Sequence, residues 1–306
     1  MKKTMKYLFV CAVGIAATGL TFVSCKEEEK LPTIDGFNNS NEVGATNLVA
    51  HWTFDDTNNE EISSAAPTKT LGTVGFTTGK IGKALQLTKG ALVYPAIDKI
   101  NTANALGNFT VSLWVNIRGQ KGVAGGGYTS LFGIIPTSTD FWGNIQATVE
   151  TGRHLPASDT LELKNYLSTM MSDGSQRGED NLAVFNADAA GTNPNAQTGA
   201  WFKGGKDWVH YAMTWEGSTG MFYIYANGVS VGGYTNRGTS AGELKMRVPA
   251  LAVFGSMASS DLGFANATRP DWAPMATASI DDVRVFNTVL PQKDVTALFN
   301  LGTAGR

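Results

Sequence analysis

From Leu48 onward, apolar side chains recur at every second position in several stretches of this chain. The pattern is clearest at 48–54, 109–117 and 208–215, where every residue of one parity is apolar. Successive side chains of a β-strand point to opposite faces, so this period is typical of strands with one buried face. Because it returns along the whole chain, it predicts an all-β fold of antiparallel sheets.

Turn residues between these stretches agree with an all-β fold. Asn227-Gly228 separates two short apolar runs and is a favoured two-residue turn of a β-hairpin. Lys89-Gly90 predicts a second hairpin, between strands at 84–87 and 91–94. Only 16% of the residues are charged, which argues against a disordered chain.

Two segments have a helical pattern. Residues 291–301 begin with Pro291 and end before Gly302, which predicts a short C-terminal helix. Residues 159–171 predict a second helix inside the long stretch 136–206, where periodicity is weak. Connections of that length are usually functional or disordered.

The first 25 residues resemble a bacterial lipoprotein signal. Three lysines within the first six residues precede an apolar run that is short for a membrane span, and the run stops at Ser24-Cys25. This resembles a lipobox and predicts that residues 1–24 are removed and that Cys25 carries the lipid. An ordinary signal peptide followed by an incidental cysteine is the alternative.

Residues 25–46 are predicted to be the lipidated cysteine and a flexible tether. The acidic run Glu27 to Glu29 resembles the export tag of lipoproteins displayed on the outer surface of some Gram-negative bacteria. We therefore expect an outer-membrane lipoprotein that faces the cell exterior. Loss of the signal-peptide lysines makes the formal net charge of -2 still more negative, and no basic patch is present, which disfavours nucleic acid as a partner.

Residues 47–306 are predicted to form one domain, and six segments of it, taken in order, resemble a known family. These segments are 48–56, 82–87, 109–115, 208–215, 225–228 and 280–287. Together they resemble laminin-G-like domains of the concanavalin A-like lectin/glucanase superfamily. The resemblance implies a jelly-roll sandwich of two antiparallel sheets whose first and last strands lie close together. It does not fix the ligand, since one fold hosts many functions.

Catalytic motifs are missing from the sequence. Hydrolases of this superfamily place paired carboxylates on one strand face, and no glutamate of this chain begins such a run. The three histidines are scattered and show no metal-ligand spacing. We therefore expect a protein that is not an enzyme.

Aspartates at the ends of the first and last predicted strands suggest a metal site. Asp56 shares the parity of Trp52 and Phe54, and Asp281 shares the parity of Val283, so both carboxylates are expected to point inward. A buried carboxylate needs a partner. Oxygen ligands suit Ca²⁺, and the resemblance adds Asp55, so Asp55, Asp56 and Asp281 form the predicted calcium site. A backbone cap or a salt bridge with Arg284 is the alternative.

Aromatic residues outside the strand pattern are candidates for ligand binding, because sugars stack on aromatic faces and need a few polar groups. The predicted ligand-binding residues are Tyr128, Trp142, Arg153, Trp201 and Trp272. Alternatively, these aromatic residues only pin long loops onto the sandwich.

These features predict a non-catalytic, carbohydrate-binding surface lipoprotein that is accessory to polysaccharide capture. A protein-binding or adhesion module of an outer-membrane complex is the second hypothesis. A diverged glycoside hydrolase is the third.

Overall fold

The computed structural model describes residues 31–137, 141–170, 176–182, 202–203, 206–234, 247–248 and 250–306. Residues 33–306 belong to one compact unit. The strands are β1 Leu48–Trp52, β2 Lys69–Thr78, β3 Lys83–Val93, β4 Asn108–Asn116, β5 Thr129–Pro136, β6 Ile145–Val149, β7 Thr160–Leu161, β8 Leu163–Met170, β9 Gln176–Leu182, β10 Phe202–Lys203, β11 Val209–Glu216, β12 Met221–Ala226, β13 Val229–Tyr234, β14 Ala250–Phe254 and β15 Ala276–Phe286. The helices are α1 Asp98–Asn101, α2 Gln292–Thr303 and the short 3-10 turns η1 Ser40–Glu42, η2 Ala45–Asn47, η3 Thr151–Arg153 and η5 Ser260–Leu262.

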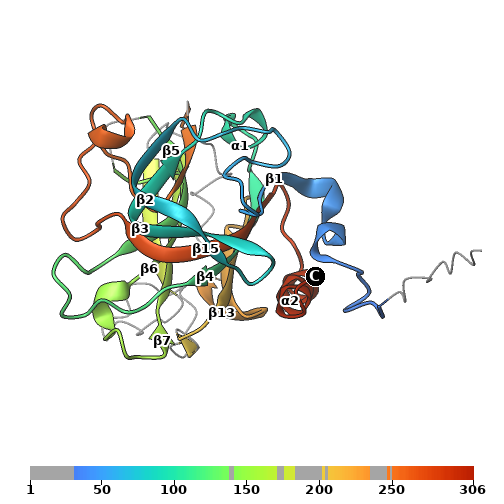
Figure 1. Cartoon of the computed structure of the whole chain (residues 1–306). Coiled ribbons are helices and arrows are strands. Elements are labelled where there is room, and N and C mark those ends of the chain that lie inside the picture. The colour runs from blue at the N-terminus through green and yellow to red at the C-terminus, as the bar shows by residue number, and fades with distance from the viewer. Residues whose placement is uncertain are drawn as a thin grey trace, which may run out of the picture. The chain divides into compact units, whose positions relative to one another are not determined.

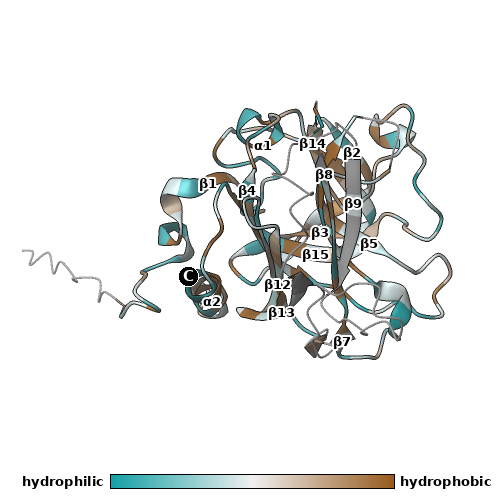
Figure 2. Ribbon diagram, turned by 180° about the vertical axis from the view of Figure 1, so that it is seen from behind, coloured by the Kyte–Doolittle hydropathy of each residue, from teal (hydrophilic) through white to brown (hydrophobic). Residues whose placement is uncertain are grey.

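The predicted all-β class is confirmed. The main strands pair in the order β13-β12-β11-β4-β15-β3-β14-β5-β6-β8-β9, with β1 added to β15 and β2 added to β3. The pairings are antiparallel throughout the described strands. Figure 1 shows the curved sheet, and in Figure 2 β4 and β12 lie across from β8 and β9. The two layers of the expected jelly roll are therefore joined through β3.

The core lies between these two layers. Trp52, Phe132 and Phe254 are fully buried, and their ring centroids lie 5.0 to 5.6 Å apart. On β4, the alternating apolar residues point into this core: Phe109, Val111, Leu113 and Val115. Burial of a large apolar side chain stabilises the fold by about 1.5–3 kcal/mol, so the alternating residues supply the main driving force.

Helix α2 covers the outer face of one layer. Its residues Val295, Leu298 and Leu301 pack with Phe286 and Leu290 in a second apolar cluster. The predicted helix at 291–301 is thus confirmed, with a slightly later start and end. No helix in the described parts of the chain is long and apolar enough to cross a membrane.

The first and last strands pair, as the family resemblance implied. Trp52 lies opposite Val283, and Ala50 lies opposite Val285. Upstream of β1, the Ser40 amide donates to the carbonyl oxygen of Arg306 at 3.3 Å, and Val43 is buried in the α2 cluster. Figure 1 shows this N-terminal segment beside α2 and the C-terminus. The folded unit therefore includes part of the segment predicted as a flexible tether.

Two local predictions are wrong. In the segment predicted as a helix over 159–171, residues 160–161 form β7 and residues 163–170 form β8. Residues 83–93 form the single strand β3 rather than a hairpin, because Lys89, with a φ of 46°, only introduces a bulge into the strand. The hairpin at Asn227-Gly228 is confirmed, with positive φ at both turn residues.

Candidate functional sites

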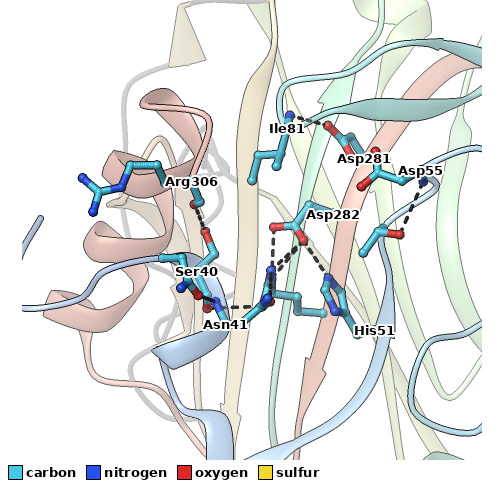
Figure 3. Close-up of a pocket in the computed structure, with 11 residues that line it drawn as sticks. Ser40, Asn41, His51, Asp55, Ile81, Asp281, Asp282 and Arg306 are labelled. Carbon is cyan, nitrogen blue, oxygen red and sulfur yellow. Dashed lines mark hydrogen bonds and ion pairs between the residues drawn. The ribbon is translucent and has the colours of Figure 1, made fainter. Parts of the chain in front are cut away.

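A small cavity of about 140 Å³ lies where β1, β15 and the β2–β3 turn meet the N-terminal segment (Figure 3). Its walls include Asp55 and Asp281, two of the three aspartates predicted to bind calcium. Asp282, His51 and Arg284 form its opposite wall. The cavity thus gathers three aspartates, one histidine and two arginines, Arg284 and Arg306.

Asp282 is held by Arg284 and His51 deep in this cavity. Its Oδ1 lies 2.7 Å from His51 Nε2, and its Oδ1 and Oδ2 each accept from Arg284 Nε at 3.0 Å. Burial alone would raise the pKa of Asp282, but the charge of Arg284 and the hydrogen bond from His51 hold it below its usual value. Arg284 also donates to the Ser40 carbonyl, so this cluster anchors the N-terminal segment.

Asp281 and Asp55 hold the tight turn between β2 and β3. Asp281 Oδ2 accepts from the amides of Lys80 and Ile81 at 2.6 and 2.9 Å, and Asp55 Oδ1 accepts from the Lys83 amide at 2.6 Å. Asp281 is fully buried, as predicted, and burial raises its pKa to about 7. Its Oδ1 has no hydrogen-bond partner within the described residues.

Asp56 does not point inward, contrary to the sequence prediction. Phe54 and Asp56 have φ values of 59° and 54°, so the alternation of β1 ends in a tight turn. The Asp56 side chain is 71% exposed and lies 3.9 Å from Lys83 Nζ. The predicted aspartate set is therefore split, with Asp55 and Asp281 on the cavity and Asp56 at the surface.

The donor atoms of the cavity fit a calcium ion in part. Carboxylate oxygens suit Ca²⁺, which takes six to eight oxygen ligands, and the unpartnered Asp281 Oδ1 is such a donor. Within the described residues, however, no three His, Cys, Asp or Glu side chains gather closely enough to hold a metal. Two aspartates would thus need backbone carbonyls and water to complete the shell.

A second candidate site is an aromatic cluster formed by Tyr128, Phe141, Trp142, Tyr166 and Trp272. The Tyr128 ring centroid lies 6.0 Å from that of Trp142 and 5.6 Å from that of Trp272. Trp142 stacks on Tyr166 at 4.2 Å with an interplanar angle of 16°. Three predicted ligand-binding residues, Tyr128, Trp142 and Trp272, thus come together, while Trp201 lies outside the described residues.

Three loops and one strand bring these rings together. Tyr128 precedes β5, Phe141 and Trp142 lie between β5 and β6, Tyr166 lies on β8, and Trp272 precedes β15. The Tyr128 amide donates to the Trp272 carbonyl at 2.9 Å. Gly127 is needed there, because a Cβ atom would lie 2.5 Å from the Trp272 oxygen. Tyr128 is buried, whereas Trp272 is 46% exposed and presents the cluster to solvent.

A charged network adjoins the aromatic cluster. Lys164 Nζ lies 5.1 Å from the Tyr128 ring centroid and 2.8 Å from Glu150 Oε1. Arg153, the predicted polar contact, pairs with Glu162 at 2.7 Å and approaches Glu150 at 3.7 Å. Glu162 is buried, and burial raises its pKa. Two cations and two carboxylates therefore neutralise one another beside the rings.

Tyr166, Glu162 and Lys164 were missed as site residues because their segment was predicted to be helical. The inward side chains of β7 and β8 are Leu161, Leu163 and Leu167, which a period of two would have identified.

Comparison with known proteins fits this fold. The family described as the concanavalin A-like lectin/glucanases superfamily matches residues 136–296, more than half of the chain. The chain belongs to this superfamily. No curated protein matches the sequence well enough to count as a relative.

Solved structures share the superfamily architecture at low identity. Domain 4 of a GH43 extracellular arabinanase from Geobacillus stearothermophilus, in complex with arabinotriose, has a TM-score of 0.50 and 19% identity, over 82% of this chain and 98% of that domain. The ligand binding domain of botulinum neurotoxin serotype D, in complex with N-acetylneuraminic acid, has a TM-score of 0.51 and 11% identity, over 85% of this chain. The binding domain of botulinum neurotoxin DC, in complex with rat synaptotagmin II, has a TM-score of 0.51 and 15% identity, over 84% of this chain. This chain spans 52% of each toxin domain.

Proposed function

We propose that this member of the superfamily is a non-catalytic, carbohydrate-binding surface lipoprotein that is accessory to polysaccharide capture. The exposed indole of Trp272 in the aromatic cluster is the observation that carries the proposal. Aromatic faces stack on the C–H surfaces of sugars, while nearby polar groups satisfy the hydroxyls. Arg153 and Lys164 supply such groups beside the rings.

The solved relatives support a binding role. The arabinanase domain was solved with arabinotriose, and the toxin domain, about half of which this chain spans, was solved with N-acetylneuraminic acid. In this chain the charges beside the aromatic cluster are balanced, which favours a neutral sugar.

A glycan array probed with the purified protein tests this function. We expect binding to a subset of glycans, and Trp272→Ala should weaken it by at least about ten-fold, as loss of an aromatic contact at the centre of an interface does. Ile62→Ala is the matched control, since Ile62 is a comparably exposed apolar residue outside the cluster, 44% against 46%. An array on which no glycan binds would reject the proposal.

The absence of catalysis is part of the proposal and has its own test. The paired carboxylates Glu150 and Glu162 are held by Lys164 and Arg153, which suits a structural network better than an acid and a nucleophile. Incubating the protein with the glycans that it binds should release no reducing ends. Sustained turnover that Glu162→Gln abolishes would establish a hydrolase instead.

A protein partner is the second candidate, because one solved relative was captured with rat synaptotagmin II. In that case the same exposed aromatic cluster would hold an outer-membrane protein. Cross-linking in intact cells followed by mass spectrometry should then give one partner whose yield falls with Trp272→Ala, while the glycan array stays blank.

We further propose a structural calcium ion at Asp55 and Asp281. Support comes from the shared cavity and from the unpartnered Asp281 Oδ1. When bound, the ion would neutralise two carboxylates that line the same cavity at the β2–β3 turn. Excess Ca²⁺ should raise the melting temperature and EDTA should lower it, and Asp281→Asn should remove this difference. Equal melting temperatures in Ca²⁺ and in EDTA would rule the ion out.

The location is likewise proposed, because Cys25 and the acidic run lie outside the described residues. A lipidated Cys25 followed by Glu27 to Glu29 supports display on the outer face of an outer membrane. Protease treatment of intact cells should remove the protein while a periplasmic marker survives. Full protection from the protease would place the domain inside.

A further inference from the structure

An open depression of about 370 Å³ lies on the outer face of β3, β15 and β4, apart from both sites above. Gln86, Ser279 and Asn116 form a row across it, because Ser279 pairs with Gln86 on one side and with Asn116 on the other. The loops at 117–123 and Pro156 form its wall. One amide, one hydroxyl and another amide are thus presented side by side.

These three side chains have hydrogen-bonding capacity to spare. In the described part of the chain, none of them hydrogen-bonds to another protein group. Elsewhere on the same face of β4, the hydroxyls are occupied: Thr110 Oγ1 donates to the Thr288 carbonyl, and Ser112 Oγ lies 2.8 Å from His210 Nε2 beneath α2. The polar face is therefore covered at one end of the strand and open at the other.

The wall of the depression is held in place. The Gln120 amide donates to the Thr151 carbonyl at 2.7 Å, and the Lys121 amide donates to the His154 carbonyl at 2.9 Å. Arg118 donates to the Lys206 carbonyl. A preformed wall reduces the entropy that a ligand loses on binding.

The side chains of Gln86, Ser279 and Asn116 indicate which class of ligand the depression would bind. Carboxamides and hydroxyls both donate and accept hydrogen bonds, as sugar hydroxyls do. Among the described residues no carboxylate lines the depression, and its one cation, Arg118, already donates to the Lys206 carbonyl. Leu87, Ile117 and Ala278, the chain neighbours of this row, belong to the hydrophobic core on the opposite face of the sheet. Neighbouring strands lie about 4.8 Å apart, which is comparable with the length of one sugar ring.

We propose that this depression is a second subsite, for a neutral saccharide chain. The inference rests on the proposed carbohydrate-binding function and deepens it. The two surfaces flank the same pair of loops: the segment 151–154, which carries Arg153, bonds to Gln120 and Lys121, while Gly127 accepts from the Gly152 amide at 2.5 Å. One polysaccharide strand long enough to cross these loops engages both surfaces and gains affinity with length.

The test is an array of neutral gluco-, manno-, xylo- and arabino-oligosaccharides of increasing length, with sialylated and uronic acid glycans for comparison. The double variant Gln86→Ala/Asn116→Ala should bind the longest neutral chains about ten-fold more weakly, as loss of two hydrogen bonds does, and the gain in affinity with length should disappear. Thr73→Ala, which removes an exposed polar side chain on β2 outside the depression, should change nothing. Melting temperatures should be unchanged, because neither the Gln86 nor the Asn116 side chain hydrogen-bonds to another described residue.

The outcomes separate this inference from the proposed function. Glycan binding that falls with Trp272→Ala but is identical in the double variant and the wild type overturns the second subsite alone. Binding of acidic glycans only overturns the neutral ligand class. Failure of every glycan to bind rejects the proposed function, and the subsite with it.

Discussion

At the scale of single residues, buried polar groups control the response of this domain to acid. His210 lies buried on β11 beside Ser112, and the centroids of its ring and of the Trp114 ring lie 5.1 Å apart. Burial lowers the pKa of His210 to about 4, while the nearby charges of Asp282 and Arg284 act in opposite directions. The folded state therefore keeps this imidazole neutral at a pH where the unfolded chain would protonate it.

This neutral histidine predicts a loss of stability in mild acid. Between the unfolded pKa of about 6.5 and the folded value of about 4, the unfolded chain binds the extra proton, so stability falls as the pH falls, by up to about 3 kcal/mol. Asp281, whose pKa burial raises to about 7, has the opposite effect over this range, so the test compares two proteins. Urea unfolding from pH 7 to pH 4.5 should show that the wild type loses more stability, or gains less, than His210→Gln, because the contribution of Asp281 is common to both. Identical slopes for the two proteins would mean that His210 does not contribute.

The Asp282 cluster predicts a large effect of one carboxylate. Asp282→Asn removes the negative charge that compensates buried Arg284, which should lower the free energy of unfolding by about 3–5 kcal/mol. Asp56→Asn is the matched control, because that carboxylate is 71% exposed, and its effect should stay within about 0.5 kcal/mol. Urea titrations of both variants measure the difference. Comparable effects would contradict the burial argument.

Sequence reasoning located part of these sites. Tyr128, Trp142 and Trp272 were singled out because they interrupt the strand pattern, and they do meet. The alternation of apolar residues correctly predicts that the Asp281 side chain is buried, but it does not predict the burial of Asp282. Asp282 has a φ of 45° at the point where the β15–β4 register shifts. That bulge lets two consecutive aspartates both be buried, which a strict period of two forbids.

At the scale of elements, α2 is fitted closely to the face that it covers. Phe299 stacks on Trp114 with ring centroids 5.8 Å apart. A Cβ atom at Gly302 would lie 2.6 Å from Trp114 Nε1, so only glycine permits this approach of helix and strand. Trp114 lies beside the uncovered end of β4, and α2 therefore sets where the open depression begins.

Gly302→Ala tests this fit. Alanine favours a helix by about 1 kcal/mol over glycine, but overpacking costs typically 1–3 kcal/mol, so we expect net destabilisation and a changed near-ultraviolet signal from Trp114. Gly75→Ala on β2 is the control, because nothing lies within 4 Å of its new Cβ. Stabilisation by Gly302→Ala would show that helix and strand can separate without loss.

The strands are predictable from sequence wherever every second residue is apolar. This alternation is interrupted on β8. There Asn165 occupies an inward position between Leu163 and Leu167 and donates to the Gln146 carbonyl at 3.2 Å. One polar residue on the inner face hid the period of two, and the remaining leucines at a spacing of four imitated a helix. Only the pairing of β8 with β6, which no local pattern encodes, decides in favour of a strand.

At the scale of the whole molecule, the ends of the folded unit meet beside α2. Ser40 bonds to Arg306, and Arg306 Nε donates to the Asn38 carbonyl at 2.9 Å. Figure 2 shows β8 and β9, in the layer whose strand β8 carries Tyr166 of the aromatic cluster, on the side away from α2. If the proposed tether joins the compact unit at this N-terminal segment, the layer that carries Tyr166 lies away from that end.

This arrangement predicts that anchoring and recognition are separable. Cys25→Ser removes the atom that would carry the lipid, and each buried CH₂ of an acyl chain contributes about 0.8 kcal/mol to membrane affinity, so the variant should move from the membrane fraction to the soluble fraction. Its affinity on the glycan array should equal that of the wild type, because the cluster and the depression both belong to the compact unit 33–306. Polysaccharide capture by whole cells should nevertheless be lost, since binding then occurs away from the cell surface. Retention of Cys25→Ser in the membrane fraction would show that another segment anchors the protein, and a change in its array affinity would show that the anchor takes part in recognition.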